Sequence, residues 1–266
     1  MSDVLPVFGD LCDESEELDQ LVGELAEEGW ARATPAEGWT VAHQIAHLAW
    51  TDRAARYALT DTDAFKGEVE KALAHPDSFV DDGADAFARL GPAALLEQWR
   101  TGREELGRAL REAPAGTRFP WFGPPMSAAS MATGRLMETW AHGQDVADAL
   151  GVERRPTDRL RHVARIAVRA RNFAFELRGL EAPDADFRIE LTAPSGELWT
   201  FGPGDAAQRV TGPALDFCLL ATQRAHRDDL AVRAEGPDAD RWLDIAQAFA
   251  GPPGAGRPAR GEGAAR

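Results

Sequence analysis

Four long segments with apolar side chains at helical spacing constrain the fold more than any other feature of the sequence. They are residues 4–28, 40–59, 92–112 and 127–150. Helical spacing gathers the apolar side chains of a segment on one face, and such faces become stable when they pack against one another. Short links between the segments favour antiparallel neighbours. Residues 1–155 are therefore predicted to form a four-helix bundle.

Shorter features complete this predicted bundle. An acidic helix is expected at 62–74, whereas the apolar segment 113–126 contains clusters of glycine and proline and is expected to be a loop. Ser127 is a favourable N-cap for the last helix, and Gly151 stands where a helix commonly ends. The bounds of this helix are therefore the best defined of the four.

The pattern changes after residue 155. One more helix is expected at 157–179, and "FRIELTAPSGELWTFGPG" then forms two alternating runs around a Pro-Ser-Gly turn, which is typical of a β-hairpin. Short strands are expected at 207–211 and 229–234, and helices at 213–224 and 238–249. The sequence therefore predicts a smaller C-terminal α/β domain over 156–252. The last stretch, 253–266, is rich in glycine, proline and alanine without periodicity and is expected to be disordered.

Charge and composition narrow the class of protein. The formal net charge of −15 repels nucleic acid and anionic lipid surfaces. No apolar run approaches the roughly 20 residues of a membrane-spanning helix. The N-terminus is acidic and lacks the features of a signal peptide, and Cys12 and Cys218 form no disulfide or metal-binding pattern. We expect a cytoplasmic monomer or homodimer that acts on a small molecule, with no nucleic-acid or membrane partner.

Two of the predicted helices each carry a pair of side chains able to bind a metal ion. His43 and His47 lie four residues apart on one helix, and Glu138 and His142 lie four apart on another. Residues at this spacing share a helix face, so the second pair and a histidine of the first could hold one divalent ion between facing helices. Three ligands with an open position are typical of a catalytic zinc site. The spacing is equally compatible with histidines in a core or on the surface.

The same stretches resemble a known family. "EGWTVAHQIAHL", followed about 90 residues later by "METWAHGQDVADALG", resembles the DinB-like metal-binding bundles, and most closely the mycothiol-dependent maleylpyruvate isomerase family and its actinobacterial relatives. "VTGPALDFCLLATQR" and "RWLDIAQAFAGPPG" fit the second domain of that family. The resemblance implies an N-terminal DinB-like bundle and a smaller C-terminal α/β domain similar to sterol-carrier folds. It extends over roughly residues 5–254.

The resemblance also implies roles for individual residues. It assigns His47, Glu138 and His142 as metal ligands. His43 stands where many relatives have aspartate, so it is expected to support a ligand, to move a proton or to be structural. Arg224 matches an arginine that reaches towards the active site in the family, which makes it a candidate contact for an anion or a thiol cofactor. His43 and Arg224 are thus the candidate catalytic residues.

The sequence also suggests roles for Asp52 and for the apolar segment 119–126. Asp52 lies within two turns of His47 and is expected to form a surface salt bridge or to accept a hydrogen bond behind the ligands. The segment 119–126 is expected either to wall the pocket and exclude water or to cover the end of the bundle.

The function implied by the resemblance is a metal- and thiol-dependent reaction. Zn²⁺, or another divalent metal such as Fe²⁺ or Ni²⁺, would bind to the three ligands. Mycothiol would be the cosubstrate for isomerisation or thiol transfer on an electron-poor small molecule. Two alternatives stay open: a thiol-independent metalloenzyme that hydrolyses or cyclises its substrate, and a non-catalytic small-molecule carrier with a structural metal. The substrate itself cannot be read from the sequence.

Overall fold

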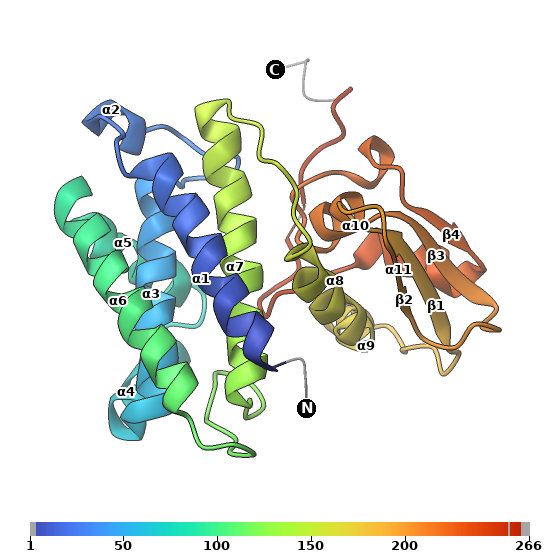
Figure 1. Cartoon of the computed structure of the whole chain (residues 1–266), viewed down its shortest axis with the longest axis horizontal. Coiled ribbons are helices and arrows are strands. Elements are labelled where there is room, and N and C mark those ends of the chain that lie inside the picture. The colour runs from blue at the N-terminus through green and yellow to red at the C-terminus, as the bar shows by residue number, and fades with distance from the viewer. Residues whose placement is uncertain (1–3, 255, 262–266) are drawn as a thin grey trace. The chain divides into compact units, whose positions relative to one another are not determined.

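The computed structural model describes residues 4–254 and 256–261, and the chain divides into two compact units, Met1–Arg154 and Arg155–Arg266 (Figure 1). The first unit is helical and the second combines helices with a small sheet, which confirms the predicted fold class. Within the described part of the chain, no helix is both long enough and apolar enough to cross a membrane.

The first unit is a bundle of four long helices with shorter helices around it. The long helices are α1 (Val4–Val22), α3 (Val41–Thr60), α6 (Pro92–Glu112) and α7 (Ala128–Leu150). Helices α1 and α3 each pack against both α6 and α7, and Figure 1 shows the four side by side. The shorter helices are α2 (Glu27–Trp30), α4 (Thr62–Ala74) and α5 (Phe79–Ala88). Helix α3 lies against α4, α5, α6 and α7, which makes it the centre of the unit.

The core of the bundle explains why α3 is central. Ile45 and Leu48 of α3 are fully buried and belong to one apolar cluster with Leu18, Leu95 and Trp99. A helix surrounded by other helices buries most of its circumference. Polar side chains on α3, such as His47, are therefore held inside the protein rather than in solvent.

Two parts of the first 155 residues differ from the prediction. The first helix ends at Val22, and α5 was not predicted at all. Helix α5 packs on α3 because Gly83 faces the ring of Trp50, where an added Cβ would lie 2.6 Å from the ring. This close approach is a tertiary feature that the local sequence of α5 does not reveal.

The second unit is built on a four-stranded sheet in the order β2-β1-β3-β4. Strands β1 (Phe187–Thr192) and β2 (Leu198–Phe201) form the predicted antiparallel hairpin. Strand β3 (Gln208–Pro213) is parallel to β1, and β4 (Arg233–Glu235) is antiparallel to β3. The helices are α8 (Leu160–Arg169), α9 (Arg171–Leu177), α10 (Ala214–Ala221) and α11 (Pro237–Ile245). The single helix predicted at 157–179 is thus two helices that meet at Ala170.

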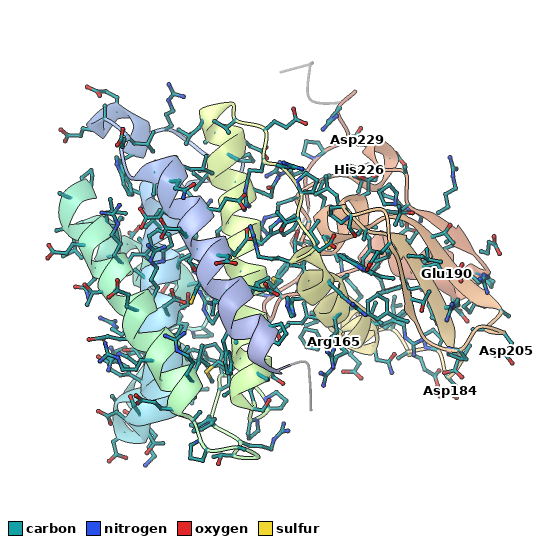
Figure 2. The ribbon with its side chains drawn as sticks, viewed as in Figure 1. Arg165, Asp184, Glu190, Asp205, His226 and Asp229 are labelled. Atoms are coloured by element: carbon teal, nitrogen blue, oxygen red, sulfur yellow. The ribbon has the colours of Figure 1, made fainter. Side chains whose placement is uncertain are left out.

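Apolar and polar side chains alternate along the strands of this sheet. On the apolar side, the Trp242 ring packs edge-on against the rings of Phe187 and Phe217, each 5.7 Å away between centroids. On the other side, Arg188 Nε and Arg209 Nη2 each lie 3.0 Å from a different carboxylate oxygen of Glu190. Glu190 is labelled on the sheet in Figure 2. The sheet therefore has one face that belongs to the core and one polar face.

The predicted disordered tail, 253–266, falls partly outside the described residues, since 255 and 262–266 are not described. Residues 256–261 form no helix or strand. The backbone N–H of Arg260 lies 3.0 Å from Asp229 Oδ2, so this part of the tail is bonded to the second unit.

Candidate metal centre

Three side chains converge between α3 and α7. His47 comes from α3, and Glu138 and His142 come from successive turns of α7. Oε2 of Glu138 lies 3.1 Å from Nε2 of His142 and 3.5 Å from Nε2 of His47. One nitrogen or oxygen from each side chain lies within 4.8 Å of the other two. The structure thus brings together the three residues that the family resemblance assigns as ligands.

The spacing of these atoms suits a small divalent ion. With metal–ligand bonds of about 2.0–2.2 Å, two ligand atoms of a tetrahedral ion lie roughly 3.3–3.6 Å apart. The separations of 3.1 and 3.5 Å measured from Glu138 are close to that value. Two imidazole nitrogens and one carboxylate oxygen form a donor set that Zn²⁺ accepts, with a fourth position left for water or substrate. The residues therefore fit the metal that the family implies.

Burial and neighbouring charges set the protonation of the ligands. Burial, together with the electrostatic effect of the neighbouring His142, lowers the pKa of His47 to about 4. Burial alone would raise the pKa of Glu138, but its close contacts with the His142 and His47 rings outweigh burial and hold this pKa well below its ordinary value. At neutral pH His47 is therefore uncharged and Glu138 is ionised. These are the forms that bind a metal cation.

The lowered pKa of His47 predicts that the metal-free protein is sensitive to acid. Below a pH of about 6.5 the unfolded chain binds a proton on His47 that the folded protein does not, so stability is lost as the pH falls. The unfolding free energy should fall by about 2 kcal/mol between roughly pH 7 and pH 5 through this group alone. Urea unfolding in the presence of a chelator measures it, and His47→Gln should show a shallower pH dependence. The same slope in both proteins would contradict the assignment.

Gln44 belongs to the centre although the sequence analysis did not single it out. It is fully buried, and its Oε1 lies 2.5 Å from Nδ1 of His142. Its Nε2 donates to Oγ1 of Thr34 at 2.8 Å. The signal that could have found it is its position three residues before His47, which places both side chains on one face of α3.

His43 lies outside the group of ligand atoms. Its Nδ1 lies 2.8 Å from Oγ1 of Thr40 and accepts the backbone N–H of Thr40 at 3.2 Å, so it helps to close the first turn of α3. Its Nε2 lies 3.2 Å from Oδ1 of Asp85 on α5. These contacts tie His43 to the start of α3 and to α5.

Aromatic rings enclose the two histidines of the candidate centre. The Trp39 ring lies 5.4 Å from that of His47 and is stacked at 6.0 Å on that of His142, while its Nε1 donates to Oδ1 of Asp81 at 2.9 Å. On another side, the Trp50 ring meets His47 edge-on at 5.8 Å. Two aromatic side chains therefore limit the access of water to the centre.

The apolar segment 119–126 continues this aromatic surface. Phe119 and Met126 pair through both backbone hydrogen bonds, which closes the segment into a loop. Phe122 lies 5.4 Å from the ring of Phe79, which in turn lies 4.9 Å from that of Trp50. Successive ring contacts therefore connect Phe122 of the loop through Phe79 and Trp50 to His47.

Asp52 of α3 and Arg135 of α7, the two helices that carry the candidate centre, form a buried ion pair. Arg135 Nε donates to Oδ1 of Asp52 at 2.8 Å, and both side chains are about 95% buried. Burial raises the pKa of Asp52, and the charge of Arg135 opposes this shift. The expected surface salt bridge is therefore an interior one that joins α3 to α7. Removing either partner would leave an uncompensated buried charge.

Arg224 lies in the second unit, just after α10. Its Nη1 donates to the backbone oxygen of Thr222 at 2.6 Å, and its side chain is half-buried. The neighbouring Arg227 is paired with the carboxylates of Asp240 and Asp244.

Comparison with known families agrees with this architecture. The family model for the mycothiol maleylpyruvate isomerase N-terminal domain matches residues 11–147, which include all three ligand candidates. A second model, for wyosine base formation, matches residues 183–235 of the α/β unit.

Related proteins and solved structures extend the comparison to most of the chain. Two uncharacterized proteins of Mycobacterium tuberculosis, from strains CDC 1551 / Oshkosh and ATCC 25618 / H37Rv, are each 56% identical over 257 residues, covering 97% of this chain and all of the relative. The crystal structures of the mycothiol-dependent maleylpyruvate isomerase and of a histidine-to-alanine mutant each match with a TM-score of 0.57 and 18% identity, covering 88% of this chain and 95% of the other. At that identity they show a shared fold. The chain belongs to the family defined by the mycothiol maleylpyruvate isomerase N-terminal domain.

Proposed function

We propose that this protein is a zinc-dependent enzyme that uses a low-molecular-weight thiol such as mycothiol for isomerisation or thiol transfer on an electron-poor small molecule. The observation that carries the proposal is the convergence of His47, Glu138 and His142 on one point inside a bundle of the isomerase family. The structural relative is described as mycothiol-dependent, which supports the choice of thiol.

The donor set suits catalysis better than a purely structural role. Structural zinc sites use four protein ligands, commonly with cysteine, whereas three ligands leave one position open. A divalent ion bound here would favour the thiolate form of a thiol that reaches this position. His47 and His142 supply neutral nitrogens, Glu138 supplies the negative charge, and Trp39 helps to exclude water.

The reactive sulfur in this proposal comes from outside the chain. Cys218 is buried in the second unit, where its Sγ faces the backbone oxygen of Leu160 and burial raises its pKa. Cys12 is exposed on α1. Among the described residues, the group of donor atoms contains no sulfur. In this proposal the nucleophilic sulfur therefore comes from a small external thiol.

Thermal unfolding with added thiol tests the proposal. Mycothiol at about 100 times its dissociation constant should stabilise the zinc-loaded protein by about 2.7 kcal/mol. The metal-free protein and an S-methyl derivative of mycothiol provide the controls, since neither offers a metal–thiolate bond. A thiol-independent metalloenzyme would show no shift with mycothiol, and a carrier with a structural metal would respond equally to the S-methyl derivative. Elemental analysis should find about one divalent ion per chain.

A further inference from the structure

A series of hydrogen bonds leads from buried His142 through buried Gln44 to the loop that precedes α3. Nδ1 of His142 contacts Oε1 of Gln44 at 2.5 Å, and Nε2 of Gln44 contacts Oγ1 of Thr34 at 2.8 Å. Oγ1 of Thr34 in turn lies 2.9 Å from the backbone oxygen of Trp39. Four groups are thus linked in series behind one ligand of the centre.

The order of donors in this chain follows from its last member. A backbone oxygen can only accept, so the hydroxyl hydrogen of Thr34 points to Trp39. The hydroxyl oxygen then has only lone pairs to offer Gln44, which must present its NH₂ group to Thr34. The amide oxygen is left facing Nδ1 of His142, and this nitrogen must carry the ring hydrogen. If the amide of Gln44 were reversed, its oxygen would face Oγ1 of Thr34. The single hydroxyl hydrogen of Thr34 could then serve either Gln44 or the backbone oxygen of Trp39, and the other contact would join two acceptors.

We infer that Gln44 and Thr34 are positioning residues that hold neutral His142 with its hydrogen on Nδ1, so that the lone pair of Nε2 points to Glu138 and His47. The inference rests on the proposed metal site. In the competing arrangement Nε2 carries the hydrogen and donates it to Glu138, 3.1 Å away. That hydrogen would occupy the lone pair that a metal needs. The chain of hydrogen bonds opposes this arrangement and so favours metal binding.

The residues around this hydrogen-bond series hold its members in place. Gln44 is fully buried, so its amide group is shielded from water. The backbone N–H of Thr34 also donates to the backbone oxygen of Trp39 at 2.8 Å, and Ala33 pairs with Thr40 across the same loop. The backbone oxygen of Trp39, which is the last acceptor of the hydrogen-bond series, is therefore held in position by the fold of the loop.

His47 offers an internal comparison. Its Nδ1 is buried and has no hydrogen-bond partner among the described residues, so no comparable chain selects its ring hydrogen. The asymmetry singles out His142 as the ligand that the protein prepares before the metal arrives.

Imidazole ¹⁵N NMR of the full-length, metal-free protein tests the inference, at a pH high enough for the histidines to be neutral. Wild type and Thr34→Ser, which keeps the hydroxyl, should show His142 with its hydrogen on Nδ1. Thr34→Val removes the hydroxyl with little change in shape and should produce a population with the hydrogen on Nε2, as should Gln44→Leu. Zinc binding should weaken about 10-fold in Thr34→Val and about 10–100-fold in Gln44→Leu. Thr34→Ser should bind zinc as wild type does.

Two results would overturn the inference. One is a hydrogen on Nε2 of His142 in the metal-free wild type. The other is wild-type zinc affinity in a folded Thr34→Val variant, which decides the matter if Gln44→Leu fails to fold by circular dichroism. The NMR measurement needs no metal. The expected position of the hydrogen in a wild type that binds no zinc would therefore support the inference and contradict the proposed function.

Discussion

Replacing Glu138 with glutamine is expected to weaken zinc binding by more than about 100-fold. Mutating a residue that only hydrogen-bonds to a metal ligand already lowers metal affinity by about 10–100-fold, and Glu138 is a proposed ligand itself. Glu138 supplies the negative charge of the group, and both imidazole Nε2 atoms point to its Oε2. Glutamine keeps the size of the side chain but removes the charge that offsets the divalent ion. Competition with a chromogenic chelator measures the change in affinity.

Two controls separate loss of a ligand from loss of structure. Glu97→Gln removes an exposed glutamate from α6 and should leave zinc affinity unchanged. His43→Ala should weaken zinc binding only mildly, because His43 contacts Thr40 and Asp85 rather than the ligand atoms. If His43→Ala abolishes zinc binding while His47→Ala does not, the assignment of the ligand on α3 is wrong.

The parts of the fold that could be predicted depend on local chemistry. Helix α6 was predicted with its observed bounds because Pro92 suits the first turn of a helix. Helix α7 was predicted from Ser127 as its N-cap and Gly151 at its end, and in the structure Ser127 accepts the N–H of Ser130 and Gly151 has a φ of 69°. The pair Glu138 and His142 lies on one helix, so its geometry is also local. These features need no knowledge of the rest of the chain.

The parts that could not be predicted depend on contacts between distant segments. Helix α5 lies where it does because Gly83 accommodates the ring of Trp50, and it brings Asp81 to Trp39 and Asp85 towards α3. The link between Gln44 and His142 spans 98 residues of sequence. Neither pairing leaves a periodic signal in one sequence. The three candidate ligands could therefore be named from the sequence, whereas the residues that contact them could not.

Replacing Arg224 with alanine is expected to lower turnover by about 100-fold, as does the loss of one electrostatic contact to a reacting group elsewhere. The family resemblance makes Arg224 a candidate contact for an anion or a thiol cofactor, which is the role that this variant tests. Its backbone is fixed by the end of α10: Gln223 has a φ of 60°, and the N–H groups of Gln223 and Arg224 bond to the oxygens of Leu220 and Leu219. These backbone bonds do not involve the arginine side chain, so the variant should fold.

Turnover of an activated alkene, with and without mycothiol, measures the effect of Arg224→Ala in the zinc-loaded protein. Metal content should not change, because all three proposed ligands lie in the first unit. Arg233→Ala removes an exposed arginine from β4 of the same unit and should keep wild-type turnover. Equal rates with and without mycothiol in the wild type would exclude the thiol mechanism. Equal rates in wild type and Arg224→Ala would remove Arg224 from the reaction.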